Sequence, residues 1–315
     1  MTSNINIEGL FYSIGTAPSA VAGQALVANG PDTASWGVPG TVGPVPRGLT
    51  YSLQSSKGLP QFTGPVGSGA IAPIWRDQAP PRYGQTWWSA SNSYVDAPII
   101  GTGINGYKTI GLNTSGSQGH APKLAANLPL NQYYSASELS VAGVFKYDGS
   151  HNIGTGSPYA GVYPALISES IGNYIGGPGS DNAVYGAGVG VGLDPLDATK
   201  VLVNFYANDS NGVSLDKFVQ STGVSASAAH YFVGVFGTGT ISLYVDNLPA
   251  VTQSGVDLVI GVEEQTTDYI QIGWNIRSTQ TRFQGEILEL DGWNVALTPS
   301  EVALQQTWMK SQSGL

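Results

Sequence analysis

The chain contains no cysteine and unusually little charge. Across its 315 residues there is no thiol, so neither a disulfide framework nor a thiolate metal site is possible. Charged residues make up 10% of the sequence, against about 25% in an average soluble protein. The net charge is −9, and a weakly charged, acidic surface disfavours nucleic acid and anionic membranes as partners. We therefore expect neither.

Long apolar runs are also missing. No apolar stretch approaches the roughly 20 residues that a membrane-spanning helix needs, and residues 1–14 lack the basic start and apolar run of a signal peptide. The histidines are few and scattered, at His120, His151 and His230, without the serine and aspartate order of a catalytic triad. The sequence thus predicts neither membrane insertion nor a triad hydrolase.

Glycine and aromatic residues, in contrast, are plentiful. The chain has 43 glycines, about twice the usual share, while 41% hydrophobic and 10% aromatic residues argue against disorder. This composition is typical of a turn-rich all-β protein. Strand-like segments occur at the spacing of a β-sandwich: Thr86–Tyr94, Leu139–Tyr147, Ala165–Ser168, Ala183–Val191, Val201–Ala207 and His230–Phe236. One short helix is expected from the capping box that begins at Thr298, running to about Met309.

The clearest local signal is the segment His230–Asn247. Two runs of β-branched and aromatic residues flank Gly237-Thr-Gly-Thr240, which predicts a β-hairpin. A period of two places Tyr231, Val233 and Val235 on one face, with Phe232 and Phe236 on the other; in the second run Ile241, Leu243 and Val245 share a face. That second strand therefore has one apolar and one polar face.

A second alternating pattern runs from Gly186 to Gly192. Its glycines share one face of a strand, and Ala187, Val189 and Val191 share the other. A glycine face permits close backbone approach or a large facing aromatic ring.

The end of the chain carries a family resemblance. After the hairpin come Tyr269-Ile-Gln-Ile-Gly-Trp274 and Phe283-Gln-Gly-Glu-Ile-Leu-Glu-Leu-Asp-Gly-Trp293, followed by Ala296-Leu-Thr-Pro-Ser-Glu-Val302. This order resembles the closing half of laminin-G-like domains of the concanavalin-A-like lectin superfamily. The resemblance covers roughly residues 86–315 and implies a two-sheet jelly-roll sandwich. It does not imply a ligand, because the fold hosts lectins, hydrolases and inert spacers alike.

Acidic residues near the end of the chain suggest one candidate site. Glycosidases of this fold carry an acidic cluster on a concave strand, and Glu289 and Asp291 are expected on one strand face beside Trp293. Asn294 stands where the second catalytic glutamate would fall, and Glu286 is expected on the opposite face, so the motif is incomplete. We expect a solvated acidic face on a non-enzymatic protein, with a glycan-cleaving hydrolase as the alternative. Leu288 and Leu290 are expected to point into the core.

Two further motifs are discounted. Gly101–Gly106 matches G-x-G-x-x-G, but a strand-like segment follows where a dinucleotide site requires a helix. Asp209–Gly212 resembles part of a calcium loop, and laminin-G-like domains often hold one calcium ion, but the full ligand pattern is missing. A plain turn is favoured there, and no cofactor or metal is expected.

Tryptophans offer a possible sugar-stacking surface. Adjacent residues of a regular strand face opposite ways, so one of Trp87 and Trp88 would be exposed. With Trp293, Glu289 and Asp291, this ring is a candidate for glycan binding. The alternative is that these rings belong to the core or to an oligomer interface.

The first residues resemble a different class of protein. Gln24, Leu26, Asn29, Gly30 and Trp36 form a Gly-Gln-x-Leu-x-x-Asn-Gly skeleton with a following tryptophan, similar to a unit common in bacteriophage fibre and appendage proteins. The Asn-Gly pair predicts a tight turn between two short strands. So small a hairpin buries too little surface to be stable alone, so we expect a homotrimer or a virion partner around it.

These observations predict three regions and one function. Residues 1–48 would be a virion-attachment or trimerisation segment that includes a Pro/Gly linker, 49–85 a Pro/Gly-rich linker or small β module, and 86–315 the sandwich. We expect a non-enzymatic structural protein of the virion surface, in a tail fibre, head fibre or capsid decoration, that binds host-surface polysaccharide. A purely particle-stabilising protein is the remaining alternative.

Overall fold

The protein is described from a computed structural model, which covers residues 3–7, 10–14, 25–30, 33–37, 43–55, 75, 77–79, 99–112, 126–127, 138–148, 165–170, 188–193, 199–208, 214–221, 223–237, 239–256, 269–272 and 283–315.

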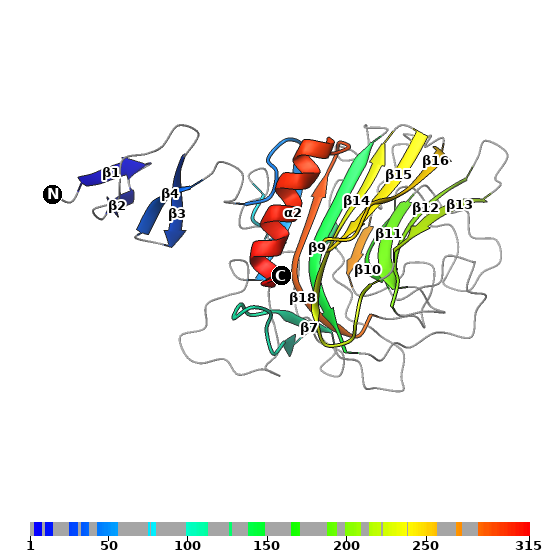
Figure 1. The fold of residues 1–315 in the computed structure, drawn as a ribbon, viewed down its shortest axis with the longest axis horizontal. Helices are drawn as coiled ribbons and strands as arrows, with labels where there is room; N and C mark the ends of the chain where they lie inside the picture. The colour runs from blue at the N-terminus through cyan, green and yellow to red at the C-terminus, as the bar shows by residue number, and fades with distance from the viewer. Residues whose placement is uncertain are drawn as a thin grey trace.

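Two antiparallel sheets form the main body (Figure 1). The strands of the larger sheet are β5 (Leu49–Gln54), β6 (Ile99–Ile100), β7 (Ile110–Leu112), β9 (Leu139–Tyr147), β14 (Ala229–Gly237), β15 (Gly239–Val245), β16 (Val251–Val256) and β18 (Gly285–Trp293). Those of the smaller sheet are β8 (Ala126–Asn127), β10 (Ala165–Ser170), β11 (Gly188–Leu193), β12 (Val201–Asn208), β13 (Ser214–Gln220) and β17 (Tyr269–Ile272).

The strand order brings distant segments together. The eight-stranded sheet runs β16-β15-β14-β9-β18-β7-β6, with β5 also pairing with β18, and the six-stranded sheet runs β13-β12-β11-β10-β17-β8. The predicted all-β jelly-roll sandwich is confirmed. Leu139–Tyr147 is β9 as predicted, and the segments beginning at Ala165, Val201 and His230 lie in β10, β12 and β14. Thr86–Tyr94 lies outside the described residues.

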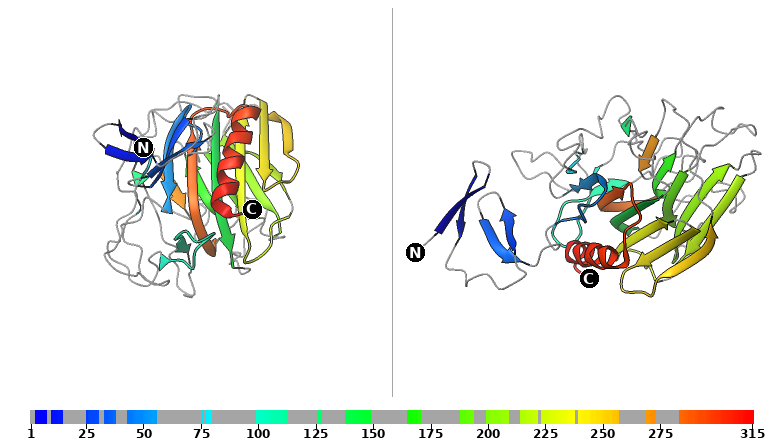
Figure 2. Two further views of the ribbon diagram at one scale, coloured as in Figure 1. Left: turned by 60° about the vertical axis from the view of Figure 1, so that its left-hand side comes forward. Right: turned by 90° about the horizontal axis from the view of Figure 1, so that it is seen from above.

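Helix α2 (Pro299–Ser313) covers the outer face of the larger sheet, where it packs on β14 and β9. In Figure 2 the helix and the six-stranded sheet lie on opposite sides of that sheet. The predicted capping box is present, because Thr298 accepts from the Glu301 amide while the Glu301 carboxylate accepts from the Thr298 amide. The helix ends at Gly314, whose φ of 78° suits a residue without a Cβ.

The hydrophobic core therefore has two layers. Between the sheets, the aromatic ring of Phe145 contacts the rings of Phe232 and Phe283. A second cluster lies between the larger sheet and α2: Val45, Ile104, Ala142, Val144, Tyr231, Val233, Val235, Leu288, Trp293, Leu297, Val302, Trp308 and Met309. Strand β14 is buried along almost its whole length because each face meets one layer, which confirms the predicted split between Tyr231, Val233 and Phe232.

Residues before 86 contribute to the sandwich, which corrects the predicted boundary. Strand β5 pairs with β18 over Leu49–Gln54, and the backbone amide of Gln78 donates to the Ser52 carbonyl on the other side of β5. Val45, expected in a free linker, is buried, and its amide donates to Gln305 Oε1 of α2 at 3.0 Å. The Pro/Gly-rich composition suggested a linker. Composition does not reveal that a short segment pairs with a strand about 240 residues later in the chain.

A separate four-stranded sheet precedes the sandwich. Its strands are β1 (Ser3–Ile7), β2 (Leu10–Ile14), β3 (Ala25–Gly30) and β4 (Thr33–Gly37), in the order β1-β2-β4-β3. Strands β3 and β4 form the predicted hairpin, with Leu26 opposite Trp36 and Gly30 opposite Thr33. Asn29 and Gly30 lie in β3 and not in the turn that the Asn-Gly pair predicted, and Gln24 is outside the described residues.

Candidate functional site

The three acidic residues of β18 lie on one face of the sheet. Glu286, Glu289 and Asp291 pair with Lys146, Val144 and Ala142 of β9, and alternate residues of a strand share a face. The register shifts between Ile287 and Glu289, so Leu288 is the extra residue of a β-bulge. The expectation that Glu286 lies on the opposite face is therefore wrong, because the bulge changes the alternation.

The same bulge moves Leu288 away from its expected place. Leu288 belongs to the cluster beneath α2, whereas Leu290 lies beside Gly143 and Phe232 between the sheets. The two leucines were expected in one core, but the inserted residue places them in different layers.

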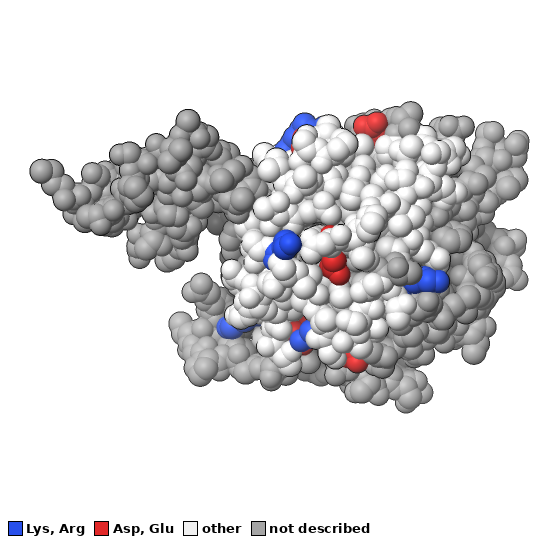
Figure 3. Space-filling view, in the orientation of Figure 1, with Lys and Arg blue, Asp and Glu red and all other residues white. Residues whose placement is uncertain are grey.

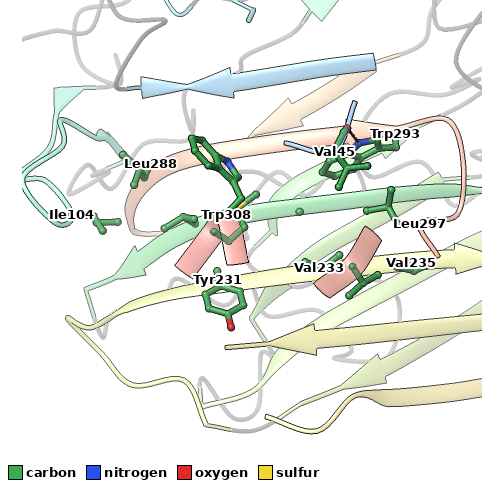
Figure 4. Packing of buried hydrophobic residues seen from close by; sticks show 13 residues of the cluster. Val45, Ile104, Tyr231, Val233, Val235, Leu288, Trp293, Leu297 and Trp308 are labelled. Atoms are coloured by element: carbon green, nitrogen blue, oxygen red, sulfur yellow. Dashed lines mark hydrogen bonds between the residues drawn. The ribbon is translucent and has the colours of Figure 1, made fainter. Parts of the chain in front are cut away.

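Helix α2 and the segment before β5 pack over this face of β18, and Figure 4 shows the hydrophobic residues of that layer, among them Val45, Trp293 and Trp308. The indole Nε1 of Trp308 donates to Glu289 Oε1 at 2.7 Å, and Gln305 Nε2 donates to Asp291 Oδ2 at 3.2 Å. The indole Nε1 of Trp293 donates to the Val45 carbonyl at 2.7 Å. Each predicted polar group of the site thus bonds to a neighbouring part of the same chain.

Burial of this site contradicts the predicted solvated face. Glu289 is 1% exposed, and Asp291 and Trp293 are 0% exposed. A sugar ring cannot stack on Trp293, and a polymer cannot reach either carboxyl group. The prediction failed because the covering groups come from residues 45 and 305, which strand periodicity does not reveal.

Burial also changes the protonation of the acidic pair. Burial, and then the negative charge of Glu289, raises the pKa of Asp291 well above its ordinary value, although hydrogen bonds with Ser52 and Gln305 oppose this. The pair therefore favours holding a proton. The two carboxyl groups join β18 to α2 through hydrogen bonds, and a substrate has no access to them.

Glu286 is held by the loop that contains the G-x-G-x-x-G match. Its carboxylate accepts from the amides of Thr102 and Gly103 at 3.1 and 2.9 Å and from the hydroxyls of Thr102 and Thr109, and Lys146 Nζ lies 3.2 Å away. Burial alone would raise its pKa, but these hydrogen bonds lower it to about 2. A strand, β7, follows the loop, as the sequence predicted, and the loop's backbone donors bind the chain's own carboxylate.

His230 has a structural partner on each nitrogen. Nδ1 lies 2.7 Å from Asp246 Oδ2, and Nε2 lies 2.9 Å from the backbone nitrogen of Ser225. No serine hydroxyl belongs to this hydrogen-bond network. The His230–Asp246 pair therefore holds the first residues of β14 in place. The other two histidines, like Trp87, Trp88 and Asp209–Gly212, lie outside the described residues.

Among the described residues, no three His, Asp or Glu side chains gather closely enough to hold a metal ion. In the same part of the chain, no helix has the length and apolar character needed to cross a membrane.

The six-stranded sheet contributes one row of buried residues to the core between the sheets. Val219, Val191 and Ile272 belong to this row, and all three are buried.

The glycine pattern predicted for residues 186–192 falls partly in β11. Gly188 pairs with Ser170 of β10 and Tyr206 of β12, and Gly190 pairs with Ser168 and Asn204.

Residues 160–303 match the family model of the Concanavalin A-like lectin/glucanases superfamily. The match begins before β10 and ends within α2, and it agrees with the resemblance seen in the sequence. No curated protein matches the chain.

Three solved structures are similar to parts of this chain. The K499G mutant of NanB sialidase from Streptococcus pneumoniae is 14% identical with a TM-score of 0.44, over 62% of this chain and 27% of that one. The Ruminococcus gnavus IT-sialidase CBM40 bound to alpha2,6 sialyllactose is 12% identical with a TM-score of 0.38, over 54% and 84%. Trypanosoma rangeli sialidase is 13% identical with a TM-score of 0.43, over 84% and 33%. The chain thus spans about a quarter to a third of the two sialidase chains.

Proposed function

We propose that this chain is a non-enzymatic structural protein of a bacteriophage particle surface, in a tail fibre, head fibre or capsid decoration, whose lectin-like sandwich binds host-surface glycan. The lectin/glucanase fold of residues 160–303 supports carbohydrate binding. The attachment role is assigned to the N-terminal sheet, which would bind a virion partner or other copies of the chain.

The burial of the candidate catalytic carboxyl groups favours binding over cleavage. A retaining glycosidase needs two carboxyl groups about 5–5.5 Å apart on either side of the scissile bond. The pair that best fits the hydrolase motif, Glu289 and Asp291, is buried beneath α2 and bonded to Trp308 and Gln305. No glycosidic bond can enter between them while the helix is in place.

The surface chemistry agrees with a weakly charged display protein. Few charged side chains appear on the described face that contains α2, and they are scattered singly (Figure 3). Such a surface offers no strong field to attract nucleic acid or an anionic membrane.

The test combines binding and turnover. Purified full-length protein is incubated with bacterial cells of a panel of strains and with polysaccharide extracted from their surfaces. We expect saturable adsorption to at least one strain, without release of new reducing ends or shortening of the polysaccharide. Release of reducing ends would make the chain a hydrolase. Absence of adsorption, together with a gain in heat resistance of particles that carry the chain, would make it a stabilising protein.

A further inference from the structure

We infer that Asn105 is a site of spontaneous deamidation, and that its conversion to an acid removes a cap from the C-terminal end of helix α2. The inference goes beyond the proposed function, because it concerns chemical ageing of the folded chain and does not depend on what the chain binds. Water is the co-reactant, and ammonia is the product that leaves.

Asn105 and Gly106 form the turn of a two-residue hairpin in the loop that binds Glu286. The backbone amide of Ile104 donates to the Tyr107 carbonyl at 3.1 Å, and the Tyr107 amide donates to the Ile104 carbonyl at 2.8 Å. Asn105 and Gly106 have φ values of 49° and 79°, and a type I′ turn requires positive φ at both central residues. Both residues are exposed, so water reaches the turn.

An asparagine that precedes a glycine is prone to cyclise. The backbone nitrogen of Gly106 attacks Cγ of Asn105; the new N–Cγ bond closes a five-membered succinimide ring, and Nδ2 leaves as ammonia with the proton of the attacking nitrogen. Water then opens the ring at either carbonyl, which gives aspartate or isoaspartate. Ring closure requires the peptide between the two residues to rotate. Gly106 permits this rotation, because no atom of the described residues lies within 4 Å of the place that a Cβ would occupy.

The side chain of Asn105 also caps the end of α2. Its Nδ2 donates to the Ser311 carbonyl at 3.2 Å, which is one of the last four carbonyls of the helix and has no partner within it. The same side chain lies against the C-cap residue, since a Cβ built on Gly314 would come within 2.9 Å of Asn105 Cγ. Asn105 thus joins the loop to the last turn of the helix.

Deamidation would turn this attractive contact into a repulsive one. A carboxylate has no N–H to donate, so the Ser311 carbonyl would face another acceptor. The negative end of the helix dipole lies at the same terminus, where an added negative charge is unfavourable. Isoaspartate would also lengthen the backbone of the turn by one carbon next to Ile104, which is buried in the cluster beneath α2. Both products should therefore loosen the last turn of the helix.

The other pairs of this kind have different surroundings. Gly30 of the Asn29–Gly30 pair belongs to β3 and pairs with Thr33, and Asn211–Gly212 lies outside the described residues. Asp291–Gly292 could form the same ring with loss of water, but Asp291 is fully buried and its strand is paired on both sides. Rotation is blocked there, so Asp291 serves as an internal control.

Peptide mapping by mass spectrometry tests the inference on the full-length protein. The folded protein is kept in mildly alkaline buffer at physiological temperature, and samples are taken over several weeks. We expect the peptide that contains Asn105 to gain the mass of an amide-to-acid conversion, in aspartate and isoaspartate forms, while Asp291 does not isomerise. The melting temperature should fall in step with the conversion, by about 2 °C in total, as for loss of one hydrogen bond.

Three variants test the contact directly. Asn105→Gly keeps a residue that tolerates positive φ but removes the cap, so it should melt about 2 °C below fresh wild type. Asn105→Asp should melt lower still at neutral pH, and this deficit should shrink below about pH 4, where the new carboxyl group is protonated and can donate again. Gly314→Ala should accelerate deamidation severalfold, because its Cβ would displace the Asn105 side chain from Ser311.

Two outcomes would overturn the inference. An intact Asn105 amide at the end of the incubation, when the same peptide in urea-unfolded protein has been converted, would reject the modification site. Conversion of Asn105 with no change in melting temperature, and none in hydrogen exchange of the peptide that ends at Leu315, would reject the capping role. Both measurements are made without glycan, so they leave the proposed function to its own test.

Discussion

At the scale of single residues, β18 carries acidic groups with opposite pKa behaviour on one face. Burial raises the pKa of Asp291 above its ordinary value of 3.8, whereas loop hydrogen bonds lower the pKa of Glu286 to about 2. A raised folded-state pKa makes stability greatest below the unfolded-state pKa and reduces it as the pH rises through the folded-state value. A lowered one gives stability above the unfolded-state pKa that disappears as the pH falls.

Asp291→Asn should therefore stabilise the protein in a pH-dependent way. The amide cannot ionise, so it avoids the cost of a buried charge while still accepting from Gln305. We expect the melting temperature to rise by about 2–4 °C near pH 8, with a smaller gain near pH 4. Thermal melts between pH 4 and pH 8 measure this difference. A gain in melting temperature that grows as the pH falls would contradict the raised pKa of Asp291.

Glu286→Gln is the matched variant with the opposite sign. It should lower the melting temperature at neutral pH, because the Thr102 and Gly103 amides lose a charged acceptor. The difference from wild type should shrink as the pH falls from about 4.5 toward 2, where the native carboxylate also protonates. A loss of melting temperature that stays constant with pH would show that the negative charge of Glu286 does not contribute to stability.

Trp293→Ala tests whether this ring is structural. Removal of a fully buried tryptophan that donates to the Val45 carbonyl should lower the free energy of unfolding by about 3–5 kcal/mol. Denaturant melts measure this, and adsorption of the protein that remains folded should match wild type. Normal stability with lost adsorption would restore Trp293 as a ligand residue.

At the scale of elements, local patterns predicted most of the sandwich. Alternating β-branched and aromatic residues indicated β9 and β14, and the Thr298–Glu301 capping box indicated α2. Strand β5 was missed because six residues beside Pro/Gly-rich sequence give a weak signal, and its status depends on pairing with β18.

The candidate site was less predictable than the fold, for two physical reasons. The bulge at Leu288 breaks the alternation from which the faces of Glu286 and Leu288 were deduced. The cover over Asp291 comes from Gln305, on an element whose position relative to the strand is set by tertiary packing.

Removal of β5 should strongly destabilise the sandwich, so a fragment that lacks this strand should fold poorly. Residues 86–315 lack β5, Val45 and the Gln78 contact, so one edge of β18 would lose its ladder partner. We expect this fragment to be insoluble or to melt at much lower temperature than residues 43–315. Cooperative unfolding of 86–315 at the temperature of the longer fragment would show that β5 is dispensable.

At the scale of the whole molecule, the small N-terminal sheet bears on assembly. Its four strands are five or six residues long, and a sheet of this size needs additional burial to be stable. We propose a homotrimer assembled through this sheet, with Trp36→Ala shifting the chain toward monomer. Multi-angle light scattering measures the mass; a wild-type monomer with a protease-resistant N-terminal sheet would contradict the trimer.

The position of β18 also sets the order of events during synthesis. This strand joins β9 to β5, although residues 285–293 follow those strands by well over a hundred positions. While the ribosome makes the intervening chain, the edges of β9 and β5 that will receive β18 have no partner. Open edges of this kind pair readily with other chains, and closure across such sequence distances is slow. Nascent chains halted before residue 285 should therefore be the species that holdase chaperones bind.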